Sequence, residues 1–151
     1  MSSQIFKHNS QPIPDDWTFL EEDQPLSCSE SPVMFSLARW LTARNQNLEY
    51  NGTIGVRLEN TDSIESLIPD LQLFQLICID FPDAVDGRGY TLANLLRNRH
   101  GYQNELRATG EVLVDQLFLL KRCGFDSFEL KPGQQINGTS NYFKPFSVEY
   151  Q

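Results

Sequence analysis

The sequence contains few of the residues from which metal sites and disulfide frameworks are built. Its 151 residues include three cysteines and two histidines, and no two cysteines have the Cys-x-x-Cys spacing. An odd number of cysteines without that spacing indicates neither a disulfide framework nor a zinc site. We therefore expect no metal site. The apolar run around Cys78 predicts that this residue is a small buried core residue.

Basic residues and long apolar runs are also scarce. Twelve basic residues stand against 20 acidic ones, which gives a net charge of −8, and lysine and arginine form no block. This composition argues against binding to nucleic acid and to anionic lipid. No segment approaches the run of about 18 apolar residues that spans a membrane, and residues 1–8 lack the plan of a secretory signal. We therefore expect a cytoplasmic protein whose partners are small molecules or other proteins.

The length of the chain fits one domain preceded by an arm. Residues 1–31 contain prolines at positions 12, 14 and 25 and an acidic run, and they show no sustained periodicity. We expect an irregular N-terminal arm over residues 1–31, with room for a short hairpin. Residues 32–151 are expected to form a single α/β domain.

Helical and extended patterns alternate from residue 32 onward. Ser31-Pro32 is typical of a helix start, and apolar residues then recur at helical spacing. The expected helices span 32–46, a short segment from Asp62 or Ser63, a segment capped by Thr91 that ends at His100-Gly101, and 111–123. The expected strands span 54–59, 73–79, 105–109 and 125–130, with Asp80 ending the second of them.

Strands that alternate with helices pair in parallel through right-handed crossovers. The predicted fold is therefore α/β, with about four parallel strands. These form either a half-barrel of the (βα)4 kind or a small open sheet, because a closed barrel of this type needs eight strands. Either arrangement leaves exposed strand edges, which predicts self-association, most simply as a homodimer.

Charged residues lie at or near the middle or the carboxyl end of every predicted strand. If these side chains point to one side of a parallel sheet, they converge where βα proteins carry out their chemistry. An ion-pair network that fills a barrel interior or a subunit interface is an equally consistent interpretation. The residues of this strand-end cluster are Arg57, Glu59, Asp80, Arg107 and Glu129.

The second candidate site is the loop after the predicted central strand. Two glycines let backbone N–H groups approach a ligand, the following helix starts with free amides, and the arginine offers a bidentate fork. The predicted anion site consists of Gly87, Arg88, Gly89, Tyr90 and Thr91. In the alternative interpretation the glycines only shape the loop, and Arg88 pairs with Asp83 or Asp86. Leu92 breaks the Gly-x-Gly-x-x-Gly pattern, so no dinucleotide cofactor is expected.

Several motifs together resemble one bacterial family of unknown function, over about residues 33–151. They are Gly55-Val56-Arg57-Leu58-Glu59, Asp80-Phe81-Pro82, Asp86-Gly87-Arg88-Gly89-Tyr90, Glu105-Leu106-Arg107-Ala108 and Cys123-Gly124-Phe125-Asp126. The genes of that family typically lie beside those for assimilatory sulfite reductase and phosphoadenylyl-sulfate reductase. The resemblance implies a role in cytoplasmic sulfate assimilation, with either reductase as a partner, and it supplies no catalytic residues.

These observations leave more than one function open. The first hypothesis is an accessory protein of sulfite or sulfate reduction that binds a small anion at the carboxyl edge of the strands. The alternative is a non-catalytic interaction module that docks on a reductase. An independent oxidoreductase has the least support, because the sequence has no redox cysteine pair and no flavin or nicotinamide fingerprint.

Overall fold

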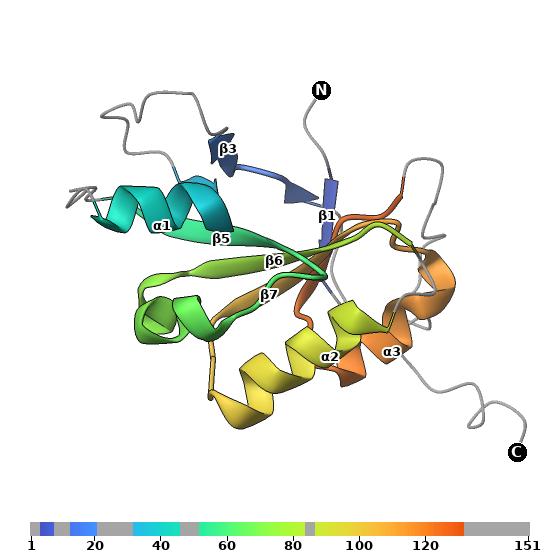
Figure 1. Ribbon diagram of the computed structural model, residues 1–151. Coiled ribbons are helices and arrows are strands. Elements are labelled where there is room, and N and C mark those ends of the chain that lie inside the picture. Colours follow the sequence, from blue (N-terminus) through green and yellow to red (C-terminus); the bar gives the residue numbers. More distant parts are fainter. Residues whose placement is uncertain (1–3, 8–12, 21–31, 46–51, 84–86, 132–151) are drawn as a thin grey trace, which may run out of the picture.

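The computed structural model describes residues 4–7, 13–20, 32–45, 52–83 and 87–131 (Figure 1). The strands are β1 (Gln4–Lys7), β2 (Ile13–Pro14), β3 (Thr18–Leu20), β4 (Val33–Ser36), β5 (Ile54–Glu59), β6 (Leu76–Phe81), β7 (Glu105–Gly110) and β8 (Ser127–Phe128). The helical segments are α1 (Leu37–Asn45), the 3-10 helix η1 (Glu65–Leu73), α2 (Arg88–Asn94), which continues as the π-helix η2 (Leu95–Arg99), the 3-10 helix η3 (Val114–Gln116) and α3 (Leu117–Arg122).

All the described strands belong to one mixed sheet in the order β2-β1-β8-β7-β6-β5-β4-β3. Strands β3 to β8 run parallel to one another, and β1 pairs antiparallel with both β8 and β2. The sheet is curled into a half-barrel, which confirms the predicted α/β class and the first of its two alternatives. The predicted number of strands is wrong. Instead of about four, eight strands pair, because β4 and three short segments from residues 1–31 join the sheet.

The predicted helix over 32–46 is wrong in its first turn. Residues 33–36 form strand β4, and the helix begins at Leu37. The cap is Ser36, whose Oγ accepts a hydrogen bond from the Arg39 N–H at 3.0 Å. Val33, Met34 and Phe35 are consecutive buried residues between two neighbouring strands, so this apolar run is extended and not helical.

Several other observed boundaries differ from the predicted ones. Strand 54–59 and the glycine stops at Gly101 and Gly124, both with positive φ, are confirmed. Asp80 lies inside β6 and does not end it, and Thr91 lies inside α2, whose N-cap is Gly87. The helix predicted over 111–123 begins as η3, because the Glu111 N–H first continues the sheet by donating to the Phe81 carbonyl at 2.7 Å. The last strand covers only Ser127 and Phe128, and η1 extends through residue 73, so β6 starts at 76.

One face of the sheet carries the apolar core. Val56, Leu58, Ile77 and Ile79 alternate along the two central strands and are fully buried. They pack with residues from each helical segment: Trp40, Ala43, Leu67, Leu71, Leu92, Ala93, Leu96, Val114, Leu117 and Leu120. In Figure 1, α2 and α3 lie on one side of β6 and β7, and β3 lies on the other side. The helix-covered face is therefore the outer face of the half-barrel.

The opposite face is crossed by a short connection. Strands β2 and β3 lie at opposite edges of the sheet, although only residues 15–17 separate them in the chain. The steps from Pro14 to Thr18 span at most roughly 14 Å, so the two edges must curve toward each other. We call residues 15–17 the strap. Trp17 in the strap packs against Met34, Leu76 and Cys78, so the strap covers the concave inner face.

Candidate functional site

The inner face presents side chains in rows, because parallel strands in register align every second residue. One row runs through neighbouring partners in the order Ser36, Arg57, Cys78, Arg107 and Ser127. The next row toward the carboxyl ends of the strands contains Glu59, Asp80 and Thr109. The structure thus brings the predicted strand-end charges onto one face, with two arginines flanking a cysteine.

Arg57 is a partly exposed arginine of the first row. Its side chain is 39% exposed, and its Nη2 donates to Asp80 Oδ1 at 2.8 Å. The same carboxylate oxygen accepts a weaker hydrogen bond from Thr109 Oγ1 at 3.4 Å. The guanidinium lies over the ring of Phe19, 5.5 Å from its centroid. Arg57 is therefore held in place by one ion pair and one aromatic face, at the open end of the half-barrel.

Arg107 is a buried arginine with three polar partners. Its side chain is 5% exposed. Its Nε donates to Ser127 Oγ at 3.1 Å, its Nη2 to Glu105 Oε2 at 3.0 Å, and its Nη1 to Asp15 Oδ1 at 3.4 Å. Ser127 Oγ in turn donates to Glu105 Oε2 at 2.7 Å. At Arg107 the charge cluster is therefore an ion-pair network that fills the interior, which is the second of the two interpretations.

Cys78 lies between the two arginines and is 2% exposed. Burial raises the pKa of its thiol to about 12, although Arg107 and Arg57 both act to lower it. The group is therefore a neutral thiol at neutral pH. Since a thiol is a poor nucleophile compared with a thiolate, Cys78 is inert while the strap covers it. This agrees with the predicted role as a small core residue.

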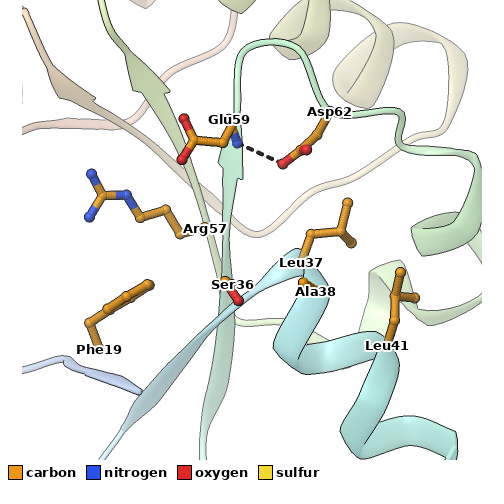
Figure 2. Close-up of a pocket in the computed structure, with 8 residues that line it drawn as sticks. All are labelled: Phe19, Ser36, Leu37, Ala38, Leu41, Arg57, Glu59 and Asp62. Carbon is orange, nitrogen blue, oxygen red and sulfur yellow. Dashed lines mark hydrogen bonds between the residues drawn. The ribbon is translucent and has the colours of Figure 1, made fainter. Parts of the chain in front are cut away.

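A pocket of about 570 Å³ opens at the carboxyl ends of β4 and β5 (Figure 2). We call it the mouth pocket. It is lined by Phe19, Ser36, Leu37, Ala38, Leu41, Arg57, Glu59 and Asp62. Figure 2 shows Arg57 and Phe19 side by side on one side and the apolar residues of α1 on the other. The Asp62 carboxylate accepts a hydrogen bond from the Glu59 N–H at 2.8 Å, which fixes the turn that closes the pocket.

A smaller cavity of about 70 Å³ lies deeper on the inner face, and we call it the inner cavity. Phe19 and Arg57 line both the inner cavity and the mouth pocket, so the two spaces adjoin. The remaining lining residues of the inner cavity are Asp15, Trp17, Met34, Cys78, Arg107, Thr109 and Glu129. Four of the five predicted cluster residues thus line one or both spaces, and the fifth, Asp80, holds Arg57.

The predicted anion loop lies elsewhere. None of its residues, Gly87 to Thr91, lines either of the two spaces. Gly87, Arg88 and Thr91 are exposed, and Asp86 lies outside the described residues. Gly89 is buried, and a Cβ there would stand 2.4 Å from the Phe81 ring, so this glycine allows close packing of α2 on β6. Tyr90 packs edge-on against the same ring, and burial raises the pKa of its hydroxyl.

Comparison with known proteins places the site within a family. Residues 55–151 match the family described as "Bacterial protein of unknown function (DUF934)". The chain belongs to this family. The match covers all five residues of the strand-end cluster, so the family resemblance stated from the motifs is confirmed at this level. The genomic link to sulfite reduction stays a prediction. Neither the curated proteins nor the solved structures contain a significant match.

The DUF934 match does not include the residues that complete the site. Asp15, Trp17, Phe19 and Ser36 precede residue 55, and no sequence pattern predicted them as site residues. A signal was present, because Asp15, Trp17 and Phe19 alternate with a period of two, as residues on one face of an extended segment do. In the described ranges, no helix has the length and apolar composition that crossing a membrane requires, and no three His, Cys, Asp or Glu side chains are grouped to hold a metal ion.

Proposed function

We propose that this chain binds an anionic metabolite in the mouth pocket and thereby serves sulfite or sulfate reduction as an accessory protein. The observation that carries this proposal is the half-exposed guanidinium of Arg57, which lines a pocket of about 570 Å³ at the carboxyl ends of parallel strands. Ligands of α/β proteins bind at this end of the sheet. Arginine is also the side chain best suited to bidentate binding of carboxylates, phosphates and sulfur oxyanions.

Two further groups suit an anion at this place. Within the described residues, the Arg57 guanidinium makes one side-chain hydrogen bond, from Nη2 to Asp80, so its other nitrogens remain available to a ligand. The first turn of α1, a helix of nine residues, contributes Leu37 and Ala38 to the pocket wall. Backbone N–H groups of a first helical turn lack partners within the helix and carry partial positive charge. An anionic group between Arg57 and this turn would be stabilised from both sides.

The rest of the pocket indicates a ligand larger than a bare oxyanion. Pockets for metabolites and drug-sized molecules have volumes of about 300–1,000 Å³, and the mouth pocket lies in that range. Phe19, Leu37 and Leu41 offer apolar surface, and the Glu59 carboxylate offers a hydrogen-bond acceptor. We therefore expect an anionic group at Arg57, an apolar or ring-shaped body against Phe19 and Leu37, and a donor group toward Glu59. The link to sulfur metabolism rests on the family resemblance.

Thermal unfolding in the presence of candidate anions tests the proposal. A ligand that binds only the folded state raises Tm with the logarithm of its concentration. We expect a larger rise with AMP, an anion with a ring-shaped body, than with sulfite, sulfate or phosphate. Ala38→Trp should abolish the response to AMP, because Ala38 is exposed and lines the pocket, so an indole fills it. Thr42→Trp is the matched control, since Thr42 is equally exposed one turn later on α1 and does not line the pocket.

A second pair of variants separates the mouth pocket from the loop at residues 87–91. Arg57→Gln should abolish the AMP response, and Arg88→Ala should retain it. The reverse result would move the anion to the loop that the glycine pattern predicted. If neither variant changes the response, or if none of the four anions raises Tm, the binding proposal fails and the alternative of a module that docks on a reductase takes its place.

A further inference from the structure

The strap places one carboxylate on the buried arginine of the inner face. Asp15 Oδ1 accepts hydrogen bonds from the Trp17 N–H at 3.1 Å and from Arg107 Nη1 at 3.4 Å. The Asp15 contact is the longest of the Arg107 hydrogen bonds, since the bonds to Ser127 and Glu105 measure 3.1 and 3.0 Å. Ser127 and Glu105 are strand residues, so the sheet alone already holds the guanidinium in place. The third partner comes from a segment that is not part of a strand.

The space beside this contact is already formed and borders several polar groups. The inner cavity of about 70 Å³ borders Asp15, Arg57, Arg107 and Thr109, which is room for a few water molecules or one small oxyanion. Arg57 and Arg107 occupy the same row, on either side of Cys78. Two guanidinium groups that face a small cavity form a recognition site for an oxyanion with several acceptor atoms.

We propose that Arg107 is an inner anion-binding site, that Asp15 occupies it as an internal ligand, and that a small oxyanion binds there by displacing Asp15 and lifting the strap. This goes beyond binding at the mouth pocket, because it concerns a second site and a movable part of the chain. The ligand class follows from the groups present: a guanidinium already oriented by Ser127 and Glu105, and a neighbouring cavity too small for a metabolite with a ring.

The charges around the site decide how the exchange can occur. Glu129 lines the cavity, Asp80 pairs with Arg57 and Glu105 pairs with Arg107, so the surroundings are already acidic. Binding an anion while Asp15 stays in the site would therefore be unfavourable. If the anion replaces the Asp15 carboxylate, which moves into solvent, the net charge of the site is preserved. The Asp15 carboxylate is tethered to the chain, so it competes with a free anion at an effective concentration in the millimolar range. We accordingly expect wild-type protein to bind small oxyanions at millimolar concentrations.

Trp17 and Cys78 report on the strap without any added label. Trp17 is half-buried against Cys78, so lifting the strap exposes both side chains to water. In a Trp40→Phe background, Trp17 is the sole tryptophan, and phosphate or sulfate should shift its emission to longer wavelength. The same anions should speed the alkylation of Cys78 by iodoacetamide in the unmodified chain, measured by peptide mapping, because the strap covers this thiol.

The deciding variant is Asp15→Asn, with Asp16→Asn as its control. Asp16 is the next residue, is exposed, and its substitution removes the same charge. By calorimetric titration with phosphate and with sulfate, Asp15→Asn should bind about 5- to 150-fold more tightly than wild type, the usual range for the coupling between two equilibria in one protein, and Asp16→Asn should bind like wild type. Equal effects of both variants would mean that net charge alone matters, and an unchanged affinity in Asp15→Asn would mean that Asp15 does not compete. Either result overturns the proposal.

The proposals for the inner site and for the mouth pocket can be tested independently of each other. Ala38→Trp fills the mouth pocket but is not part of the inner cavity, so the phosphate affinity gained by Asp15→Asn should persist in the double variant. Loss of AMP binding with retention of the phosphate effect would support both proposals. If AMP does not bind at all while the Asp15 effect is present, the inner site stands and the proposed function falls. If the phosphate effect disappears in the double variant, the phosphate lies in the mouth pocket and the inner site is wrong.

Discussion

The side chain of Arg97 lies against the backbone of Gly124, and its Nε donates to the Gly124 carbonyl oxygen at 2.9 Å. A Cβ at position 124 would stand 2.5 Å from Arg97 Cγ, and the φ angle there is +112°. The guanidinium also donates to the carbonyls of Tyr102 and Asn104 at 2.7 and 2.8 Å and to the Asp126 carboxylate. Unlike Arg57, Arg97 therefore directs four of its five guanidinium N–H groups to the protein, and it joins the π-helix η2 to the segments before β7 and β8.

Arg97→Lys should reduce the free energy of unfolding by about 1.5–3 kcal/mol, because an ammonium group cannot satisfy the same fork of acceptors. Urea unfolding measures this directly. Arg99→Lys is the control, since Arg99 is exposed two residues later, and it should change stability by less than about 0.5 kcal/mol. Similar losses in both variants would contradict a special role for Arg97.

Gly55→Ala should destabilise the protein and disturb the strap. A Cβ at Gly55 would stand 2.8 Å from the Leu76 carbonyl oxygen and 3.0 Å from Trp17 Cζ3, and the first of these is backbone that cannot move aside. We expect a loss of about 1–3 kcal/mol in the free energy of unfolding, with an altered Trp17 emission. Gly87→Ala has nothing within 4 Å of the new Cβ and should leave both unchanged. A Trp17 emission in Gly55→Ala equal to that of wild type would show that Trp17 does not pack against β5.

Stability should fall as the solution becomes alkaline. The pKa of Cys78 is raised from 9.0 to about 12 in the folded state, so between these values the folded state keeps a proton that the unfolded state has lost. The contribution of Cys78 to stability is therefore complete below pH 9 and decreases as pH rises toward 12, by up to about 1.4 kcal/mol per pH unit. Cys78→Ala should reduce this slope in urea unfolding from pH 8 to pH 11. An identical slope in the variant would place the thiol in contact with water.

The homodimer remains a prediction, although the edges of the sheet support it less than a sheet of four strands would. Strands β2 and β3 form the edges of the sheet, with two and three residues respectively, and Pro14 has no N–H to offer a neighbouring strand. Dimerisation would then use another surface, and η1 offers Leu73, which is 54% exposed, and Ile68, which is 37% exposed. Light scattering should give a dimer mass that Leu73→Lys reduces and that Leu119→Lys, 53% exposed on α3, does not. A monomer mass for wild type at high concentration would refute the dimer.

Local sequence patterns predicted the central strands well. In β5, apolar residues alternate with Arg57 and Glu59, and β6 is continuously apolar up to Cys78 and Ile79, so hydrophobic periodicity was sufficient there. The start of α1 was misplaced because Ser31-Pro32 and Ser36 are both plausible caps. Only pairing with β3 and β5 decides that residues 33–36 are extended.

The candidate site was predictable only in part. The charges on β5 to β8 follow from their positions at strand ends, but the curvature that turns a row of charges into an enclosed face does not appear in any local pattern. That curvature depends on the strap, which joins segments remote in sequence, as the pair Asp15 and Arg107 shows. The anion site predicted at residues 87–91 stays a prediction, because the close packing of Gly89 on Phe81 leaves the same sequence pattern as a ligand-binding turn.

The antiparallel pairing of β1 with β8 also sets an order of events during synthesis. Phe6 is paired with Phe128, so β1 leaves the ribosome long before the strand with which it pairs. At typical rates of translation these two residues emerge on the order of ten seconds apart. Contacts so distant in the chain form late because a long loop must close first. The nascent chain therefore passes through a stage in which β5 and β6 can already be paired while Cys78 still faces the solvent of the cell.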